Sequence, residues 1–167
     1  MGGFFVTRAA PAALAIGMAL AGCASLPVKE AANDTPLGAG VNVPAGSNED
    51  FIVNVGRRVF FAESSAALDD TALETLGKQA KWLTDYPAYK IKIEGFADDP
   101  GGAPVNLALG IRRAQAAQSF FAAQGIASAR MRVKSFGSTR HVRNCDDIGC
   151  KAQNRRVVTV LDTETGA

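Results

Sequence analysis

Apolar residues recur at helical spacing in two stretches of this chain. The first stripe consists of Ala72, Leu76, Ala80 and Leu83. Thr71 and Glu74 have the spacing of a capping box, which predicts a helix start, and Pro87 predicts its end. The second stripe consists of Leu107, Gly110, Ala114, Ala117 and Phe121, within a helix expected from Asn106 to Gln124. Gly125 follows at the position of a C-terminal cap.

Four shorter stretches have the composition of strands. Residues 90–94 alternate polar and apolar side chains, as expected of a half-buried strand. The other three are residues 57–61, 131–136 and 155–161. The resulting order is β-α-β-α-β-β, which predicts an α+β two-layer sandwich with helices packed on one face of the sheet.

The N-terminal segment differs from the rest of the chain. Residues 9–21 are apolar but interrupted by Pro11 and Gly17, and they fall short of the roughly 20 residues that a membrane-spanning helix needs. Small residues then lead into Cys23, in the sequence Leu20-Ala21-Gly22-Cys23. This segment resembles a bacterial lipoprotein signal, which implies that residues 1–22 are removed and that Cys23 carries lipid. A buried cysteine in an N-terminal helix is the alternative.

The remaining chain divides by composition. Residues 23–50 contain three prolines and no apolar period, so we expect a lipidated N-terminus followed by a flexible linker. Residues 51–162 form one domain of a size that supports a single core, and residues 163–167 form a C-terminal tail.

Two cysteines, Cys145 and Cys150, lie close together in a polar stretch with a glycine. In an exported chain the compartment is oxidising, so we expect these two thiols to form a disulfide. The alternative is a metal site, but with His141 it would offer at most three soft ligands. We therefore expect no metal or other cofactor, and His141 as a solvated loop residue.

Charge and motifs narrow the class of function. The formal net charge is +2, which argues against bulk nucleic-acid binding. The sequence contains no nucleophile elbow and no phosphate-binding glycine loop, so we expect no catalytic residues. The weak enzymatic alternative is a carboxylate pair, Asp98 with Asp99 or Glu94, acting on a sugar.

Four linked motifs resemble the peptidoglycan-binding OmpA-like domain, in the version found in peptidoglycan-associated lipoproteins. They are residues 93–98, Gly101, residues 106–114 and residues 154–157. The resemblance covers about residues 56–162 and implies a mixed sheet. It also implies non-catalytic binding of the diaminopimelate stem peptide of peptidoglycan. The site residues it implies are Asp98, Arg113, Asn106, Leu107, Phe61, Asn154 and Arg155.

The charges of this ligand support a binding site that holds one negative and one positive side chain at a fixed separation. An amino-acid zwitterion needs both charges, and the planar guanidinium of Arg113 suits a carboxylate. The alternative is that Asp98 caps a turn and that Arg113 lies on a solvated helix face. The alternative for Asn154 and Arg155 is that they brace the last loop. The alternative for Phe61 is that it belongs to the core.

One departure from the family pattern concerns Phe96, which stands where a His is usual. We expect it to make the wall of the binding groove apolar.

The resemblance also implies a cellular setting. The chain would be an outer-membrane lipoprotein, lipid-anchored, with its domain in the periplasm, where it tethers the membrane to the cell wall. It further implies a role in the Tol-Pal system with a TolB-like periplasmic propeller protein as partner. The alternative is an envelope scaffold or assembly lipoprotein whose domain contacts proteins rather than peptidoglycan.

Overall fold

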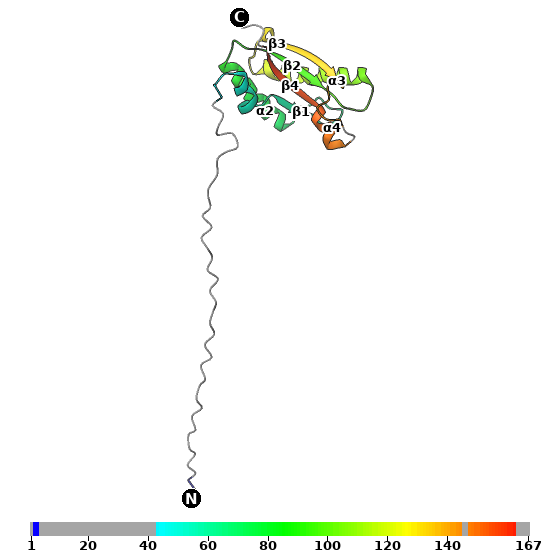
Figure 1. Ribbon diagram of the computed structural model, residues 1–167. Coiled ribbons are helices and arrows are strands. Elements are labelled where there is room, and N and C mark those ends of the chain that lie inside the picture. The colour runs from blue at the N-terminus through cyan, green and yellow to red at the C-terminus, as the bar shows by residue number, and fades with distance from the viewer. Residues whose placement is uncertain (1, 4–42, 145–146, 163–167) are drawn as a thin grey trace. The chain divides into compact units, whose positions relative to one another are not determined.

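The computed structural model describes residues 2–3, 43–144 and 147–162 (Figure 1). The short helix α1 (Asn48–Asp50) continues into a π-helical turn (Phe51–Val55), and β1 (Arg58–Phe60) follows. The central elements are α2 (Asp70–Asp85), β2 (Lys90–Phe96) and α3 (Ala103–Ala123). A 3-10 turn (Ser128–Arg130), β3 (Met131–Gly137), α4 (Ile148–Asn154) and β4 (Arg156–Asp162) complete the chain.

The strands form one mixed sheet in the order β1-β4-β2-β3. β2 and β3 run parallel, whereas β4 runs antiparallel to both β1 and β2. α2 and α3 pack against one face, and the core between the two layers contains the buried stripe residues of α2 together with Ala114, Ala117 and Phe121. The predicted α+β sandwich, with helices on one face of a mixed sheet, is confirmed.

The start of α2 differs from the prediction. The carboxylate of Asp69 accepts a hydrogen bond from the backbone N–H of Ala72 at 2.8 Å and caps the helix. Thr71 therefore lies in the first turn, and the predicted capping box does not form. Asp69 takes its place because a carboxylate accepts well at the positive end of a helix.

A pair of glycines brings α3 close to β2. A Cβ atom on Gly95 would collide with the carbonyl oxygen of Gly110, and one on Gly110 would collide with the hydroxyl of Ser135. The stripe prediction holds for the rest of α3 except at Leu107, whose side chain is 46% exposed. The backbone of Leu107 contacts Ser135 and Gly137 at the end of β3, while its side chain is turned toward solvent.

The chain also folds in two stretches expected to be irregular. α4 occupies seven residues of the polar stretch before β4, where the sequence shows no apolar period. At the other end, Gly46 and Asp50 pack against the end of α2. The carboxylate of Asp50 accepts hydrogen bonds from the Trp82 indole at 2.8 Å and from the Gly46 N–H at 2.9 Å. Residues 43–50, the end of the segment expected to be linker, therefore belong to the folded domain.

Several predicted features lie outside the described residues. These are Cys23, Cys145, residues 1 and 4–42, and the tail at 163–167. Cys150, in α4, is disulfide-bonded. Among the described residues, no helix is both long and apolar enough to cross a membrane.

Candidate functional site

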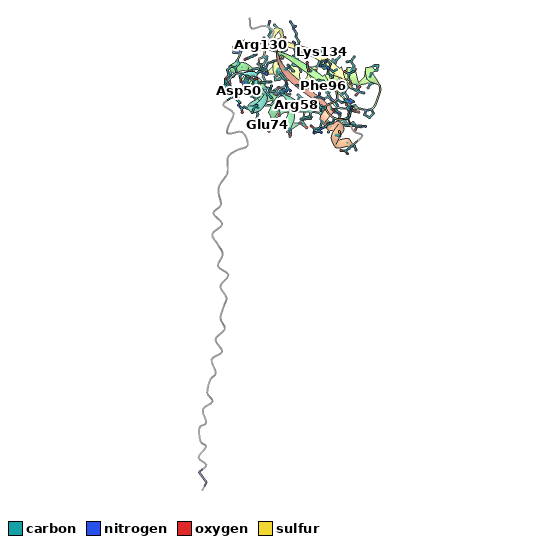
Figure 2. The ribbon with its side chains drawn as sticks, viewed as in Figure 1. Asp50, Arg58, Glu74, Phe96, Arg130 and Lys134 are labelled. Atoms are coloured by element: carbon teal, nitrogen blue, oxygen red, sulfur yellow. The ribbon has the colours of Figure 1, made fainter. Side chains whose placement is uncertain are left out.

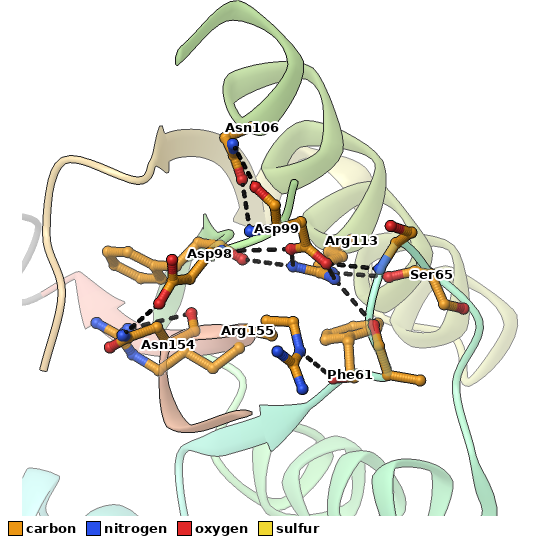
Figure 3. Close-up of polar contacts among 12 residues, drawn as sticks. Phe61, Ser65, Asp98, Asp99, Asn106, Arg113, Asn154 and Arg155 are labelled. Atoms are coloured by element: carbon orange, nitrogen blue, oxygen red, sulfur yellow. Dashed lines mark hydrogen bonds and ion pairs between the residues drawn. The ribbon is translucent and has the colours of Figure 1, made fainter. Parts of the chain in front are cut away.

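Three chain segments meet at one edge of the sheet. β1 and β2 end there and β4 begins there, because Phe60 lies opposite Arg156 and Gly95 opposite Val157. The loops that follow β1 and β2 and the end of α4 therefore bring together most of the predicted site residues (Figure 3).

Arg113 lies at the centre of this edge, with its side chain fully buried. Its Nε donates to the carbonyl of Ser65 at 2.7 Å. Nη1 donates to the carbonyl of Phe96 at 3.1 Å and to the Asp99 carboxylate at 2.8 Å. Nη2 donates to the carbonyl of Ala62 at 3.0 Å and to the other Asp99 oxygen at 3.2 Å. All five N–H groups are thus used within the protein.

This saturation changes the expected role of Arg113. Burial lowers the pKa of its guanidinium from the ordinary value, while the bond and charge of Asp99 act in the opposite direction. Arg113 does not lie on a solvated helix face, and none of its N–H donors is free for a ligand. It joins the loop after β1 to the loop after β2. Arg112, in contrast, is exposed, as expected from helical geometry.

Asp99 is the residue that the sequence analysis missed as the partner of Arg113. Its side chain is 1% exposed, and besides the ion pair it accepts hydrogen bonds from the N–H groups of Ser64 and Asp98. The Asp98-Asp99 dipeptide offers two candidate acids at adjacent positions. Only the tertiary structure shows which one turns inward.

The side chain of Asn106 holds the loop between β2 and α3 through hydrogen bonds. Its side-chain oxygen accepts from the Asp99 N–H at 3.0 Å, and its amide nitrogen approaches the carbonyls of Asp99, Gly101 and Gly102 at 3.0 to 3.3 Å. Asn106 is buried, and its polar atoms are taken up by this loop. Leu107 lines a different, apolar hollow on α3 together with Pro104 and Phe136, so it does not join Asp98.

Asp98 is half-buried and faces the end of α4. It accepts a hydrogen bond from the Asn154 side chain at 2.8 Å, and His141 Nε2 lies 3.7 Å from its other oxygen. Asn154 is fully buried and also holds the preceding loop, through the N–H groups of Val142 and Arg143 and the carbonyl of Arg143. Asn154 therefore positions the Asp98 carboxylate.

Arg155 has the free donors that Arg113 lacks. Its guanidinium makes one long hydrogen bond, from Nε to the carbonyl of Phe61 at 3.4 Å, and its charge acts to lower the pKa of Arg113. The four N–H groups on its Nη atoms have no partner among the described residues. Phe61 is 5% exposed, belongs to the core, and lies with its ring centre 5.4 Å from the Arg113 guanidinium.

Asp98 and Arg155 line one hollow of about 190 Å³, which we call the mixed-charge hollow. Its other lining residues are Glu63, Asp99, Pro100, Ile148 and Lys151. Three acids and two bases share a small space, so the hollow can accommodate a ligand that carries both an ammonium and a carboxylate. Phe96 does not line it. The Phe96 side chain lines a separate hollow with Arg156 and Val158, so Phe96 supplies no apolar wall to the mixed-charge hollow. Within the described ranges, no three His, Cys, Asp or Glu side chains cluster so as to hold a metal ion.

Comparison with known proteins identifies the family. The model of the OmpA family matches residues 60–155. The chain belongs to the OmpA family. It is 46% identical over 150 residues to a peptidoglycan-associated lipoprotein of Agrobacterium fabrum, covering 89% of this chain and 85% of that protein. A protein of the same name from Brucella melitensis is 50% identical over 151 residues, covering 90% and 89%.

A solved structure supports the same relation. The peptidoglycan-associated lipoprotein of Burkholderia pseudomallei superposes with a TM-score of 0.61 at 33% identity, covering 64% of this chain and 90% of that chain. The resemblance inferred from the four motifs is confirmed. Proteins of this family are non-catalytic, so the prediction that the chain is not an enzyme agrees with its family.

Proposed function

We propose that this chain is a lipoprotein of the bacterial cell envelope that associates with peptidoglycan without cleaving it. The names of its relatives at 46 to 50% identity support this proposal. The finer proposal is that the mixed-charge hollow binds the diaminopimelate end of the stem peptide, and that a lipid on Cys23 anchors the chain to the outer membrane. The domain then tethers the outer membrane to the cell wall from the periplasm.

The observation that carries the finer proposal is the pairing of Asp98 with Arg155 in one hollow. Among the described residues, His141 is the one polar neighbour of the second Asp98 oxygen, which leaves that oxygen open to a ligand ammonium. Arg155 supplies unpaired N–H groups for a carboxylate, and Lys151 adds a second cation. Arg113 and Asn106 then act as positioning residues, because they shape the loop that presents Asp98.

Retention on purified sacculi tests this assignment. Asp98→Asn and Arg155→Gln should each weaken retention by roughly thirtyfold or more, since removal of one partner of a desolvated charge pair leaves the other uncompensated. Arg112→Gln, which removes the same charge from an exposed position, should retain the wild-type behaviour. Sacculi whose stems carry lysine in place of diaminopimelate lack the distal carboxylate and should also bind poorly.

The outcomes separate the functions. If folded Arg155→Gln protein sediments with sacculi as well as wild type does, the hollow is not the binding site. If wild type itself is not retained, the alternative of a scaffold that contacts proteins is favoured. Release of soluble sugar fragments would indicate an enzyme.

By the same family resemblance, we propose a role in the Tol-Pal system. A TolB-like periplasmic propeller protein that covers the mixed-charge hollow should reduce retention of the chain in the same sacculus assay. A propeller protein that leaves retention unchanged does not cover the hollow.

A further inference from the structure

The face of the sheet opposite α2 and α3 carries more basic than acidic side chains. Successive residues of a strand point to opposite faces, so the residues that flank the core residues Ile91 and Ile93 along β2 lie on this second face. Its cations are Arg58, Lys90, Lys92, Arg132, Lys134 and Arg156. Its acids are Glu94 and Asp162, and Asp162 pairs with Lys92 at 3.0 Å. Figure 2 labels Arg58, Phe96 and Lys134 from three of the strands.

One end of this face is hollowed, with a volume of about 240 Å³. Four arginines line it: Arg57, Arg58, Arg140 and Arg156. The remaining lining consists of one acid, Glu94, and the apolar side chains of Phe96, Val158 and Val160. We call this cavity the arginine hollow. It shares no lining residue with the mixed-charge hollow.

Arg156 is built into the arginine hollow rather than lying loosely over it. Its guanidinium stacks 3.9 Å from the ring centre of Phe96, which in turn stacks on Phe136 at 5.3 Å. Arg140 stacks on the same Phe136 ring at 3.8 Å. Arg156 is 5% exposed, and its position is therefore set by packing.

The donors of Arg156 are largely unused, in contrast to those of Arg113. Nη1 donates to the carbonyl of Asn154 at 3.4 Å and Nη2 to that of Arg140 at 3.3 Å, both long contacts. Nε is buried without a hydrogen-bond partner. Burial is the main cause that lowers the pKa of Arg156, and the nearby charge of Arg58 acts in the same direction. Each Nη atom has a second N–H without a hydrogen-bond partner among the described residues, and an anion in the hollow would accept from these groups.

The charge of the hollow indicates what kind of anion fits. The side chains of Arg57, Arg58 and Arg140 make no hydrogen bond or ion pair with any residue in the described part of the chain. Four guanidinium groups thus face one carboxylate, so a group with two or more negative charges matches the hollow better than a single carboxylate does. Arginine also binds phosphate oxygens with two parallel N–H donors.

We propose that the arginine hollow binds a phosphate-bearing group, a phosphomonoester or a pyrophosphate. This site shares no lining residue with the mixed-charge hollow and does not rest on the function proposed above. Phe96 and Phe136 supply the rigid stack that holds the arginines apart, and the apolar floor of Val158 and Val160 lowers the local dielectric.

Calorimetric titration of the full-length chain with inorganic pyrophosphate, at low ionic strength, tests the proposal. Wild type should bind with a saturable heat. The double variant Arg58→Gln/Arg140→Gln should bind at least about tenfold more weakly, because it removes two charged donors. Both side chains are exposed, so the fold should remain, and retention on sacculi should be unchanged.

Arg132→Gln is the matched control. Arg132 is exposed on the same face of the sheet but does not line the hollow, so its loss should change the affinity by no more than about twofold. An equal loss in this control and in either single variant, Arg58→Gln or Arg140→Gln, would show diffuse attraction to a basic face and overturn the proposal. The absence of saturable binding by wild type would overturn it as well.

Two further arms identify the source of the phosphate. Vesicles of phosphatidylcholine with added phosphatidic acid present a phosphomonoester on a membrane, and pure phosphatidylcholine vesicles serve as the control. Arginine-dependent binding to the mixed vesicles indicates a lipid headgroup, whereas binding of pyrophosphate alone indicates a soluble ligand. A peptide of glutamates that binds the hollow more tightly than pyrophosphate would replace the proposal with an acidic protein partner.

Discussion

At the scale of single residues, three arginines near the sheet edge have three different environments. Arg113 uses all five N–H groups within the protein, Arg155 uses one, and Arg156 uses two in long contacts. All three are buried, so burial alone does not distinguish a structural arginine from a binding one. The count of unused donors does, because a ligand needs a donor that the protein has left free.

Arg113→Gln should therefore destabilise the domain more than it affects binding directly. It would leave the buried Asp99 carboxylate without its partner, at a cost of about 3–5 kcal/mol in the free energy of unfolding. Urea denaturation measures this loss, and Arg112→Gln, which is exposed, should change stability by less than about 0.5 kcal/mol. The double variant Arg113→Gln/Asp99→Asn should lose less than the sum of the two single changes. Wild-type stability of Arg113→Gln would contradict the assigned role.

At the scale of elements, the close approach of α3 to β2 determines the position of the loop between them. The approach depends on Gly95 and Gly110, since neither position has room for a Cβ atom. The C-terminal end of β2 and the first turns of α3 are joined by the loop that carries Asp98 and Asp99. A shift of α3 away from the sheet would therefore displace that loop.

Gly110→Ala should destabilise the domain by about 1–3 kcal/mol, because the added methyl meets Ser135 and the backbone of Gly95. Gly77→Ala is the matched control. Gly77 lies inside α2 with no atom within 4 Å of an added Cβ, so the change should stabilise by about 0.5–1 kcal/mol through helix propensity. Thermal or urea unfolding measures both, and a stabilising Gly110→Ala would contradict the close contact.

At the scale of the whole domain, the segment that precedes β1 is part of the fold. Asp50 joins it to α2 through the Trp82 indole, and the Tyr89 hydroxyl donates to the carbonyl of Gly46 at 2.8 Å. The Trp82 ring also packs against those of Phe51, Tyr86 and Tyr89. A chain that begins at residue 51 would lose the hydrogen bonds of Asp50 and Gly46.

Stability should accordingly depend on pH through Asp50. Hydrogen bonds from Asn54, Trp82 and Gly46 lower the pKa of this carboxyl below 3.8. The group therefore binds protons more weakly when folded, so its contribution is fully present above about pH 4 to 5 and is lost as the pH falls through the lowered pKa. Free energies of unfolding measured from pH 6 to 2.5 should fall less steeply in Asp50→Asn than in wild type. Glu49→Gln, at the exposed neighbouring position, should follow the wild-type curve.

The sequence by itself determined the elements whose signals are local. Apolar stripes at helical spacing located α2 and α3, and alternation and composition located all four strands, because these periods follow from the geometry of each element alone. The four linked motifs and their spacing were sufficient to identify the family.

Only the tertiary structure decided which side chains are free to bind. The Arg113 to Ser65 contact spans 48 positions and the Asn154 to Asp98 contact spans 56, so no local pattern could show that Arg113 is saturated or that Asp98 faces α4. The same holds for Phe96, whose ring turned to the far face of the sheet. Hydrogen-bond satisfaction depends on where distant backbone carbonyls end up, and packing of the whole domain sets those positions.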